Sequence, residues 1–281
     1  MIRIGTRGSA LALAQARWVA DRIEDESELV TITTAGDRGE EQNDKSRWVS
    51  ALEQALLDGR VDLAVHSAKD VPAELAQGLE LVAIPERADP RDAICGAPSL
   101  AALGAGARVG TSSLRRAAQI RAARADLEVV DVRGNVDTRL GKLADGECEA
   151  LVLALAGLER LGRAADGVLD ELVPAAGQGA LAIEARPGGW PLDALADPDA
   201  TACVTAEREL TATLEATCNT PVGAYAVVID PAHPGELELT AWVGKPDGSA
   251  WIADRLRGGP EGLGRAVAQR LLGVGAGELL V

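Results

Sequence analysis

The chain has 281 residues, 47% of them hydrophobic, and a formal net charge of −15 at pH 7. This length suits two or three small domains, and the hydrophobic content excludes a disordered chain. The negative charge argues against a nucleic-acid-binding protein that works through a broad basic face. No uncharged apolar stretch reaches the roughly 18 residues that a membrane span needs.

Strand-like and helix-like segments alternate along the first part of the chain, which is typical of an α/β protein. Asp89-Pro90-Arg91 interrupts the alternation, so we place the crossing to a second domain there. The polar stretch 35–47 is predicted to be a mobile loop. The other expected elements are strands over 2–6, 29–34, 61–66 and 79–84, and helices over 9–23 and 49–57.

The second part repeats the alternation and then returns to the first. A turn-rich segment, 174–179, precedes a strand over 180–184 that we expect to rejoin the first domain. The other expected elements are strands over 108–110, 128–132 and 150–155, and helices over 112–123, 136–144 and 157–161.

The character of the sequence changes after Asp197-Pro198, where a small α+β domain is predicted. Its expected elements are helices over 200–214 and 263–272 and strands over 224–229, 237–244 and 251–256. The predicted domains are therefore residues 1–88 with 180–197, residues 89–179, and residues 198–281.

The four cysteines are Cys95, Cys148, Cys203 and Cys218. They form no Cys-x-x-Cys pair and have no histidine partner nearby, so a zinc site or a disulfide framework is not expected. The ordinary interpretation of each is a small buried hydrophobic residue.

Basic or hydroxyl residues lie between a predicted strand and a predicted helix at three places. Free backbone N–H groups and the helix dipole favour an anion there, and arginine adds a forked donor that matches a carboxylate or a phosphate. In a parallel sheet such places meet at the carboxyl edge of the strands, so three of them imply a ligand with several negative groups. The arginines that we place in this site are Arg7, Arg115, Arg116, Arg133 and Arg139, whereas Arg121 and Arg124 are expected on the solvated surface.

The segment His66-Ser67-Ala68-Lys69-Asp70 follows the apolar strand directly. A carboxylate beside Lys and Arg stays ionised, so Asp70 could stabilise a cationic intermediate or hold a ring N–H. An Asp that only caps a turn is the alternative. We expect His66 to be packed behind the site and not to be a general base.

Eight segments, in this order, resemble the hydroxymethylbilane synthase (porphobilinogen deaminase) family over nearly the whole chain. They are IGTRGSALALAQ (4–15), AVHSAKDVP (64–72), ERADPRDA (86–93), VGTSSLRRAAQI (109–120), VRGNVDTRL (132–140), LALAGLERLG (153–162), PAAGQGALAIE (174–184) and AERELTATLEATCNTPVGAYA (206–226). Some of these segments are weak singly, but as an ordered set they are highly specific.

The resemblance implies an α/β protein with two domains like type II periplasmic binding proteins and a small α+β C-terminal domain. It also implies a dipyrromethane cofactor, made from two porphobilinogen units and bonded to a cysteine through a thioether. The matching cysteine is Cys218, whereas the other three keep their interpretation as buried residues.

The implied activity is that of a transferase in tetrapyrrole and haem biosynthesis. It joins four porphobilinogen molecules head to tail, releases ammonia, and frees hydroxymethylbilane by hydrolysis. By motif match, Asp70 would be catalytic and would stabilise the azafulvene cation left by deamination. The implied cofactor-binding residues are Cys218, Lys69, Asp70, Ser113, Arg115, Arg116 and Arg133, and the implied substrate-binding residues are Arg7, Ser9, Arg133, Arg139 and Arg160.

Two segments depart from the family pattern. Around the active-site loop, Trp48 stands where Phe is usual, and Ser50 replaces a Lys. Ahead of Cys218, the usual Gly-Gly is Ala216-Thr217. Loop gating and the stiffness of the cofactor loop are therefore expected to differ, whereas Asp70 and the thiol are unchanged.

Other functions compete with this interpretation. They are a non-catalytic receptor of the periplasmic-binding fold for an anionic metabolite, a homologue that binds the cofactor but turns over poorly, and a phosphate-handling transferase. The last would need Mg²⁺-binding carboxylates, of which we find no convincing set, and we predict no metal site. The glycines at 104, 106 and 110 have the wrong spacing for a nicotinamide-binding loop.

The expected setting is the cytoplasm, because the chain reads directly into a strand without a charged and then apolar leader. The acidic surface fits a monomer, since net charge opposes association. The expected partner is the small molecule porphobilinogen, with no nucleic acid and no membrane.

Overall fold

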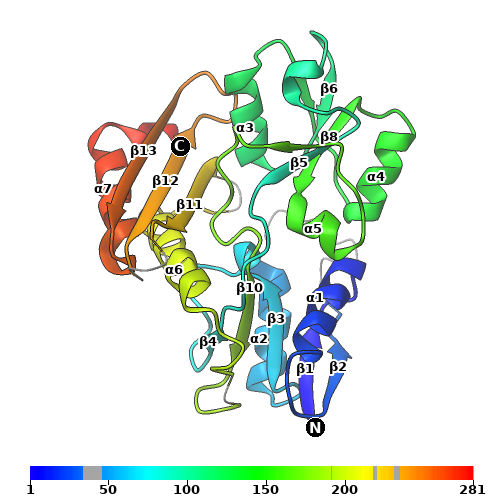
Figure 1. The fold of residues 1–281 in the computed structure, drawn as a ribbon, viewed down its shortest axis with the longest axis vertical. Helices are drawn as coiled ribbons and strands as arrows, with labels where there is room; N and C mark the ends of the chain where they lie inside the picture. Colours follow the sequence, from blue (N-terminus) through cyan, green and yellow to red (C-terminus); the bar gives the residue numbers. More distant parts are fainter. Residues whose placement is uncertain (34–45, 191, 218–219, 231–234, 281) are drawn as a thin grey trace. The chain divides into compact units, whose positions relative to one another are not determined.

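The computed structural model describes residues 1–33, 46–190, 192–217, 220–230 and 235–280, without the side chains of 46–49. It has the mixed α/β fold that the sequence predicts. The chain forms two compact units (Figure 1). Unit 1 contains residues 1–88 and 180–202, and unit 2 contains residues 89–179 and 203–281.

Unit 1 is built on a five-stranded sheet with the order β2-β1-β3-β10-β4. β1 is parallel to β2 and β3, whereas β10 runs antiparallel to both β3 and β4. β10 follows the segment that returns from unit 2, so residues far apart in the chain share this sheet. The elements are β1 (Ile2–Thr6), α1 (Ala10–Ala20), β2 (Ser27–Thr31), α2 (Ser46–Leu57), β3 (Leu63–Ser67), the 3₁₀ helix η2 (Ala68–Asp70), β4 (Glu80–Ala83) and β10 (Leu181–Ala185).

Alternating side chains of β3 reach two separate apolar clusters, because successive residues of a strand point to opposite faces. Leu63 packs in a cluster with Val19 of α1, and Ala64 packs in a second cluster with Leu52 of α2. Helices on both faces explain why β3 is an almost continuous buried run. They also fix the end of β3, where Asp70 follows.

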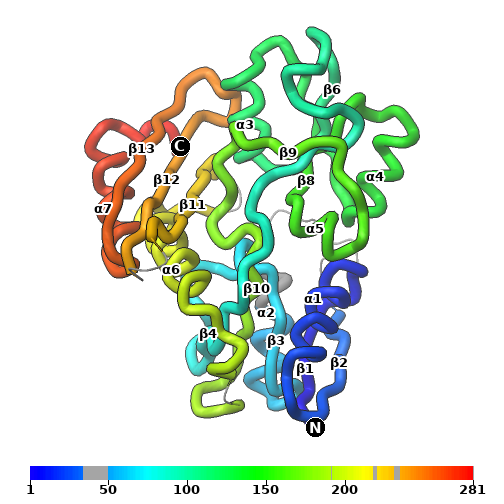
Figure 2. Tube along the Cα trace, viewed as in Figure 1, coloured from blue at the N-terminus to red at the C-terminus, as the bar shows by residue number. Residues whose placement is uncertain are grey.

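Unit 2 contains a second five-stranded sheet with the order β7-β6-β8-β5-β9. Two of its strands, β5 and β9, were not predicted, because they are only four and three residues long and show no clear alternation. Figure 2 shows the β9 segment, which pairs with β5. The elements are β5 (Asp92–Cys95), η3 (Leu100–Ala102), β6 (Arg108–Gly110), α3 (Leu114–Ala123), β7 (Glu128–Val130), α4 (Val136–Ala144), β8 (Ala150–Ala154), α5 (Leu155–Arg160) and β9 (Gly167–Leu169).

The C-terminal part of unit 2 is an antiparallel sheet with the order β11-β12-β13. Helix α6 begins in unit 1 and ends in unit 2. The three-domain division proposed from the sequence treats this part as a domain of its own. The elements are α6 (Pro198–Thr213), β11 (Val222–Val228), β12 (Leu237–Gly244), β13 (Trp251–Gly258), α7 (Pro260–Gly273) and η4 (Ala276–Leu279).

The turn between β12 and β13 packs directly on α3. Arg121 of α3 donates from Nη1 to the carbonyl of Pro246, 2.8 Å away. Gly248 lies so close to α3 that a Cβ atom would be 2.7 Å from the backbone nitrogen of Ala122. Arg121 is therefore a partly exposed residue that docks this turn, whereas a solvated side chain was expected.

Arg124 also differs from that expectation. Its guanidinium donates to the carbonyls of Leu100 and Leu103 and pairs with Asp126. It therefore ties the end of α3 to the segment around η3.

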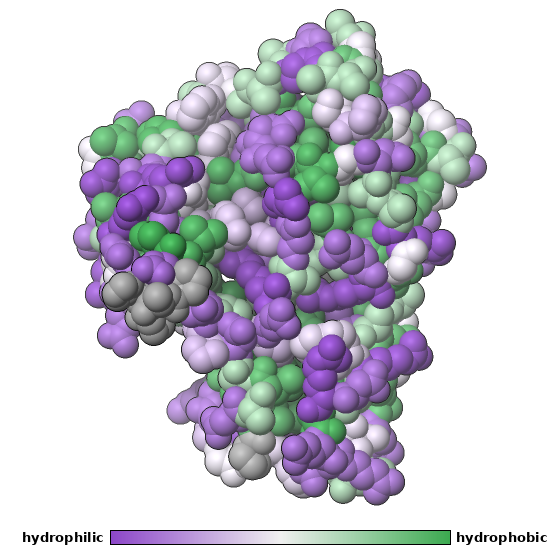
Figure 3. Space-filling view, in the orientation of Figure 1, coloured by the Kyte–Doolittle hydropathy of each residue, from purple (hydrophilic) through white to green (hydrophobic). Residues whose placement is uncertain are grey.

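The face drawn in Figure 3 mixes hydrophilic and hydrophobic residues. Among the described residues, no helix is both long enough and apolar enough to cross a bilayer. The large apolar side chains that are exposed in the described ranges are Met1, Leu57, Trp190, Val227, Trp251, Leu272 and Val274.

Candidate active site

In unit 1, the first strand–helix junction carries Arg7 and Ser9. Ser9 caps α1, and its hydroxyl accepts a hydrogen bond from the backbone N–H of Ala12 at 3.3 Å. This cap places Arg7 and Ser9 beside the end of β3. The structure brings both into the wall of a small cavity of about 80 Å³, which Asp70 also lines.

Asp70 is held by a short turn of 3₁₀ helix, η2, that begins where β3 ends. Ser67, the last residue of β3, accepts a hydrogen bond from the Gln15 amide of α1 at 2.7 Å. The strand, the helix and the turn therefore meet at the cavity. Lys69 neighbours Asp70 in the same turn but is not one of the residues that line the cavity.

A buried polar pair borders this cavity, because His66 is one of the residues that line it. His66 Nε2 is 2.9 Å from Glu184 Oε2, and both side chains are almost fully buried. Glu53 of α2 is close enough to interact electrostatically with both, and burial raises its carboxyl pKa. The packed role expected for His66 agrees with this arrangement, but its partner Glu184 was not foreseen.

In unit 2, the second junction carries Ser113, Arg115 and Arg116. Ser113 caps α3, with its hydroxyl 3.5 Å from the backbone nitrogen of Arg116. Both arginine side chains are buried and converge on Asp92, the first residue of β5. Arg115 Nη1 lies 2.8 Å from Asp92 Oδ2, and Arg116 Nη2 lies 2.8 Å from Asp92 Oδ1.

Gln178 completes this group of buried polar side chains. Its amide nitrogen donates to Asp92 Oδ1 and to the carbonyl of Pro90, each at 2.7 Å. Its amide oxygen accepts a hydrogen bond from Arg116 Nη2 at 3.3 Å. We call Asp92, Arg115, Arg116 and Gln178 the arginine–aspartate cluster.

The arginine–aspartate cluster carries more positive than negative charge. Burial alone would raise the pKa of Asp92, but the fields of Arg115 and then Arg116 lower it well below its usual value. Burial lowers the pKa of Arg115. One carboxylate can balance only one of the two guanidinium charges, and no hydrogen bond is found for the buried Arg115 Nε. A ligand with carboxylates fits this excess.

Arg160 adds a third cation in the same unit. Its Nη2 donates to the carbonyl of Gly179 at 2.7 Å, next to Gln178 in the chain. Burial lowers the pKa of its guanidinium. Arg116 and Arg160 thus both contact the segment 178–179.

The third junction differs, because its side chains are exposed. Asn135 caps α4 through a hydrogen bond from the Thr138 backbone N–H to its side-chain oxygen at 2.8 Å. Arg133 pairs with Asp131 at 2.7 Å, and about half of each side chain is exposed. Arg139 donates from Nε to the carbonyl of Gly134 at 2.7 Å. Exposed arginines of this kind can bind a ligand, and in its absence water solvates their charge.

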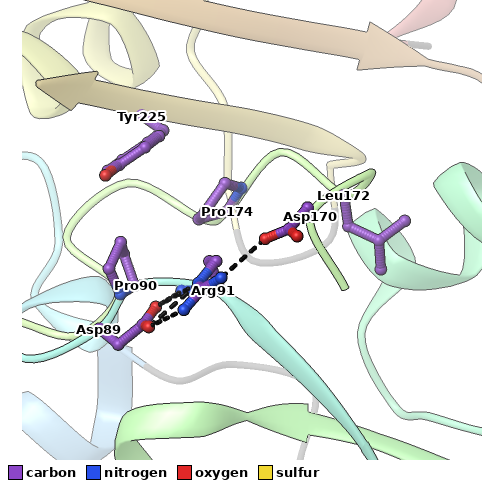
Figure 4. Close-up of a pocket in the computed structure, with 7 residues that line it drawn as sticks. All are labelled: Asp89, Pro90, Arg91, Asp170, Leu172, Pro174 and Tyr225. Carbon is purple, nitrogen blue, oxygen red and sulfur yellow. Dashed lines mark hydrogen bonds and ion pairs between the residues drawn. The ribbon is translucent and has the colours of Figure 1, made fainter. Parts of the chain in front are cut away.

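A larger cavity of about 440 Å³ lies at the start of unit 2 (Figure 4). Arg91 spans it, pairing with Asp89 at 2.6 Å and with Asp170 at 2.8 Å. Tyr225 of β11 and Pro174 also line it. Because two carboxylates surround one guanidinium, this cavity does not suit an anionic ligand.

The predicted cofactor attachment residue, Cys218, lies outside the described residues. So does most of the predicted mobile loop over 35–47, but its last two residues belong to α2, which begins at Ser46 and not at 49 as predicted. The other three cysteines, Cys95, Cys148 and Cys203, are buried, as expected. Within the described ranges, no group of His, Cys, Asp and Glu side chains is placed to hold a metal ion.

Sequence reasoning missed Asp92, Gln178 and Glu184. Glu184 had a usable signal, because it is a charged residue in an otherwise apolar predicted strand, whereas Asp92 begins a strand, β5, that the sequence did not predict. Such a charge needs a buried partner. Gln178 had no comparable signal in the turn-rich segment that contains it.

Comparisons with known proteins identify the family to which the chain belongs. A profile described as "Porphobilinogen deaminase, dipyromethane cofactor binding domain" matches residues 2–190, and "Porphobilinogen deaminase, C-terminal domain" matches residues 201–273. The chain is 45% identical to the porphobilinogen deaminase of Deinococcus deserti, over 99% of this chain and 97% of that protein. It is 49% identical to that of Sorangium cellulosum, over 88% of each chain.

Among solved structures, substrate-binding domain 2 of GlnP from Lactococcus lactis aligns with 68% of this chain and 83% of its own. The identity is 12% and the TM-score is 0.40. The profile and sequence matches extend over nearly the full length at high identity. The chain therefore belongs to the porphobilinogen deaminase family.

Proposed function

We propose that this protein is a hydroxymethylbilane synthase, which joins porphobilinogen molecules head to tail on a covalent dipyrromethane. The chain belongs to the family, and the structural observation that supports this proposal is the excess of buried positive charge in the arginine–aspartate cluster. Porphobilinogen carries an acetate and a propionate group. A chain of such units presents the several carboxylates that Arg115, Arg116 and Arg160 can hold.

Cys218 is the attachment residue in this proposal. The other cysteines are poor candidates, because Cys95 and Cys148 lie in an apolar core and burial raises the pKa of both thiols. A thiol must become a thiolate to act as a nucleophile, and burial opposes this. Cys218 also stands in the family segment that ends at residue 226. When bound, the dipyrromethane supplies the primer to which substrate units are added.

Asp70 is the catalytic residue in this proposal. Its turn at the end of β3 places the carboxylate in a cavity wall with Arg7 and Ser9. A fixed carboxylate can accept a hydrogen bond from a pyrrole N–H and can stabilise the positive charge that develops on the substrate as ammonia leaves. Arg7 and Ser9 then hold the carboxylates of the incoming substrate. Lys69, next to Asp70 in the chain, binds a carboxylate of the cofactor.

The remaining arginines bind carboxylates in two ways. Arg115 and Arg116, at the capped start of α3 beside Ser113, supply a buried positive field to the cofactor. Arg133 and Arg139 reach the ligand from an exposed junction, where charge-assisted hydrogen bonds form and exchange readily. Arg160 binds the growing chain from beside Gly179.

The cellular location, the oligomeric state and the domain boundaries are also proposals. A monomer in the cytoplasm is supported by the net charge of −15 and by Cys95 and Cys148, whose reduced thiols are typical of a reducing compartment. The division into residues 1–88 with 180–197, 89–179 and 198–281 is supported by the separate C-terminal sheet.

The experiment that tests the attachment site is the intact mass of the protein purified from a haem-making host. The wild type should exceed its sequence mass by two linked pyrrole units, and Cys218→Ser should show no excess. Cys203→Ala, which changes a buried cysteine of the same unit, should keep the adduct. An adduct that persists in Cys218→Ser would refute the attachment.

The activity is tested with porphobilinogen itself. The wild type should consume it and release ammonia, and the product should be hydroxymethylbilane. A protein that carries the adduct but releases no product would be the poorly turning-over homologue considered above.

A further inference from the structure

The arginine–aspartate cluster lies where the chain enters and leaves unit 2. The chain enters at residue 89 and returns to unit 1 after residue 179. Gln178 joins these two segments, because its amide donates to the carbonyl of Pro90 and to Asp92. The side chains that hold the arginines therefore come from both connecting segments.

Every nitrogen of the Arg116 guanidinium has a hydrogen-bond partner. Nε donates to Asp92 Oδ1 at 2.9 Å, Nη1 to the carbonyl of Val152 and Nη2 to Gln178. Arg115 is held less completely, by Asp92 and by the carbonyl of Val173 at 2.7 Å. The conformations of both arginines thus depend on one carboxylate, Asp92.

A purely structural role does not explain this arrangement well. A buried ion pair contributes little to stability compared with apolar residues of the same volume, and a buried charge without a counterion is costly. A cluster with two guanidiniums and one carboxylate retains that cost. A bound anion would offset this cost by balancing the excess positive charge. It can do so only if the two guanidiniums are held where the anion can reach them.

We propose that Asp92 and Gln178 are positioning residues, which hold the guanidiniums of Arg115 and Arg116 in the geometry that the cofactor carboxylates require. This inference rests on the proposed function. Neither residue needs to touch the cofactor. Asp92 fixes both arginines, and Gln178 fixes Asp92 and Arg116 to the two connecting segments.

The experiment compares Asp92→Asn and Gln178→Met with the wild type. Asparagine keeps the shape of Asp92 but removes its negative charge, and its amide nitrogen can only donate, so it cannot pair with both guanidiniums. Methionine keeps the length of Gln178 and removes its hydrogen bonds. Leu169→Ala is the matched control, because Leu169 is fully buried in a core cluster of unit 2 that does not contain these side chains.

The readouts are the fraction of protein that carries the adduct, by intact mass, and the urea midpoint. A third readout is the mass gained when apoprotein is incubated with porphobilinogen. We expect Asp92→Asn to lower the adduct fraction by about tenfold or more, since small misplacements of binding groups have large effects. Gln178→Met should lower it less, and Leu169→Ala should keep it despite a lower urea midpoint.

Two results would overturn this inference and leave the proposed function intact. One is a wild-type adduct fraction in both Asp92→Asn and Gln178→Met. The other is an equal loss of adduct in Leu169→Ala at a matched urea midpoint, because lost stability would then explain every variant. A wild-type protein without any adduct would instead overturn the proposed function, and this inference with it.

Discussion

An alanine at Gly248 should separate the β12–β13 turn from α3. The backbone of Gly248 has a φ of +74°, a region that favours glycine. A Cβ atom there would lie 2.7 Å from the nitrogen of Ala122 and 2.9 Å from the carbonyl oxygen of Ala118. These are backbone atoms of a helix, so they cannot move aside as a flexible side chain could.

The magnitude follows from two terms. Placing an alanine in the left-handed region costs about 1–2 kcal/mol, of which about 0.4–1 kcal/mol is regained because the unfolded chain is less flexible. Overpacking adds about 1–3 kcal/mol. The free energy of unfolding should therefore fall by about 1–4.6 kcal/mol in Gly248→Ala.

Gly146→Ala separates these terms. Gly146 has a φ of +77°, but nothing lies within 4 Å of its Cβ position, so only the backbone term applies. Urea unfolding at pH 7 should give a loss of about 1.6 kcal/mol or less for Gly146→Ala. Equal losses in the two variants would refute the docking of the turn on α3.

Three further predictions concern the site. Asp70→Ala should keep a urea midpoint close to the wild type but consume porphobilinogen at least about 10²-fold more slowly; near-normal turnover would remove Asp70 from catalysis. Arg133→Gln should slow elongation about tenfold, because it loses a charge-assisted contact. Arg163→Gln should not, although Arg163 is equally exposed and also pairs with one Asp; equal effects would contradict a binding role for Arg133. Because the pKa of Asp92 is lowered in the folded state, its stabilisation is complete above its unfolded value of about 3.9 and is lost as the pH falls toward the folded value. Urea midpoints from pH 5 to pH 2.5 should show this loss in the wild type, and a parallel curve for Asp92→Asn would contradict it.

Local signals in the sequence predicted several elements closely. The helix over 136–144 has the bounds that were expected, because Asn135 is a strong cap and the helix ends at the turn around Gly146. Ser9 and Ser113 cap α1 and α3 for the same reason. The motifs that place Asp70 and the arginines after strands are also local, since each lies within a few residues of a strand end.

Long-range contacts escaped prediction. The partners of Arg116 are 24 and 62 residues away in the chain, at Asp92 and Gln178. Nothing near Arg116 in the sequence distinguishes a buried guanidinium from one that is free to bind a ligand. Arg121 was assigned to the surface for a similar reason, because the turn on which it docks lies 125 residues further along.

The sequence by itself determined the α/β class, the family, and the types of residue that can hold a polycarboxylate, because these depend on local patterns and ordered motifs. The tertiary structure decided that Arg115 and Arg116 are buried on one carboxylate whereas Arg133 remains exposed. It did so because burial and charge balance are set by strands and turns that meet only in the folded chain.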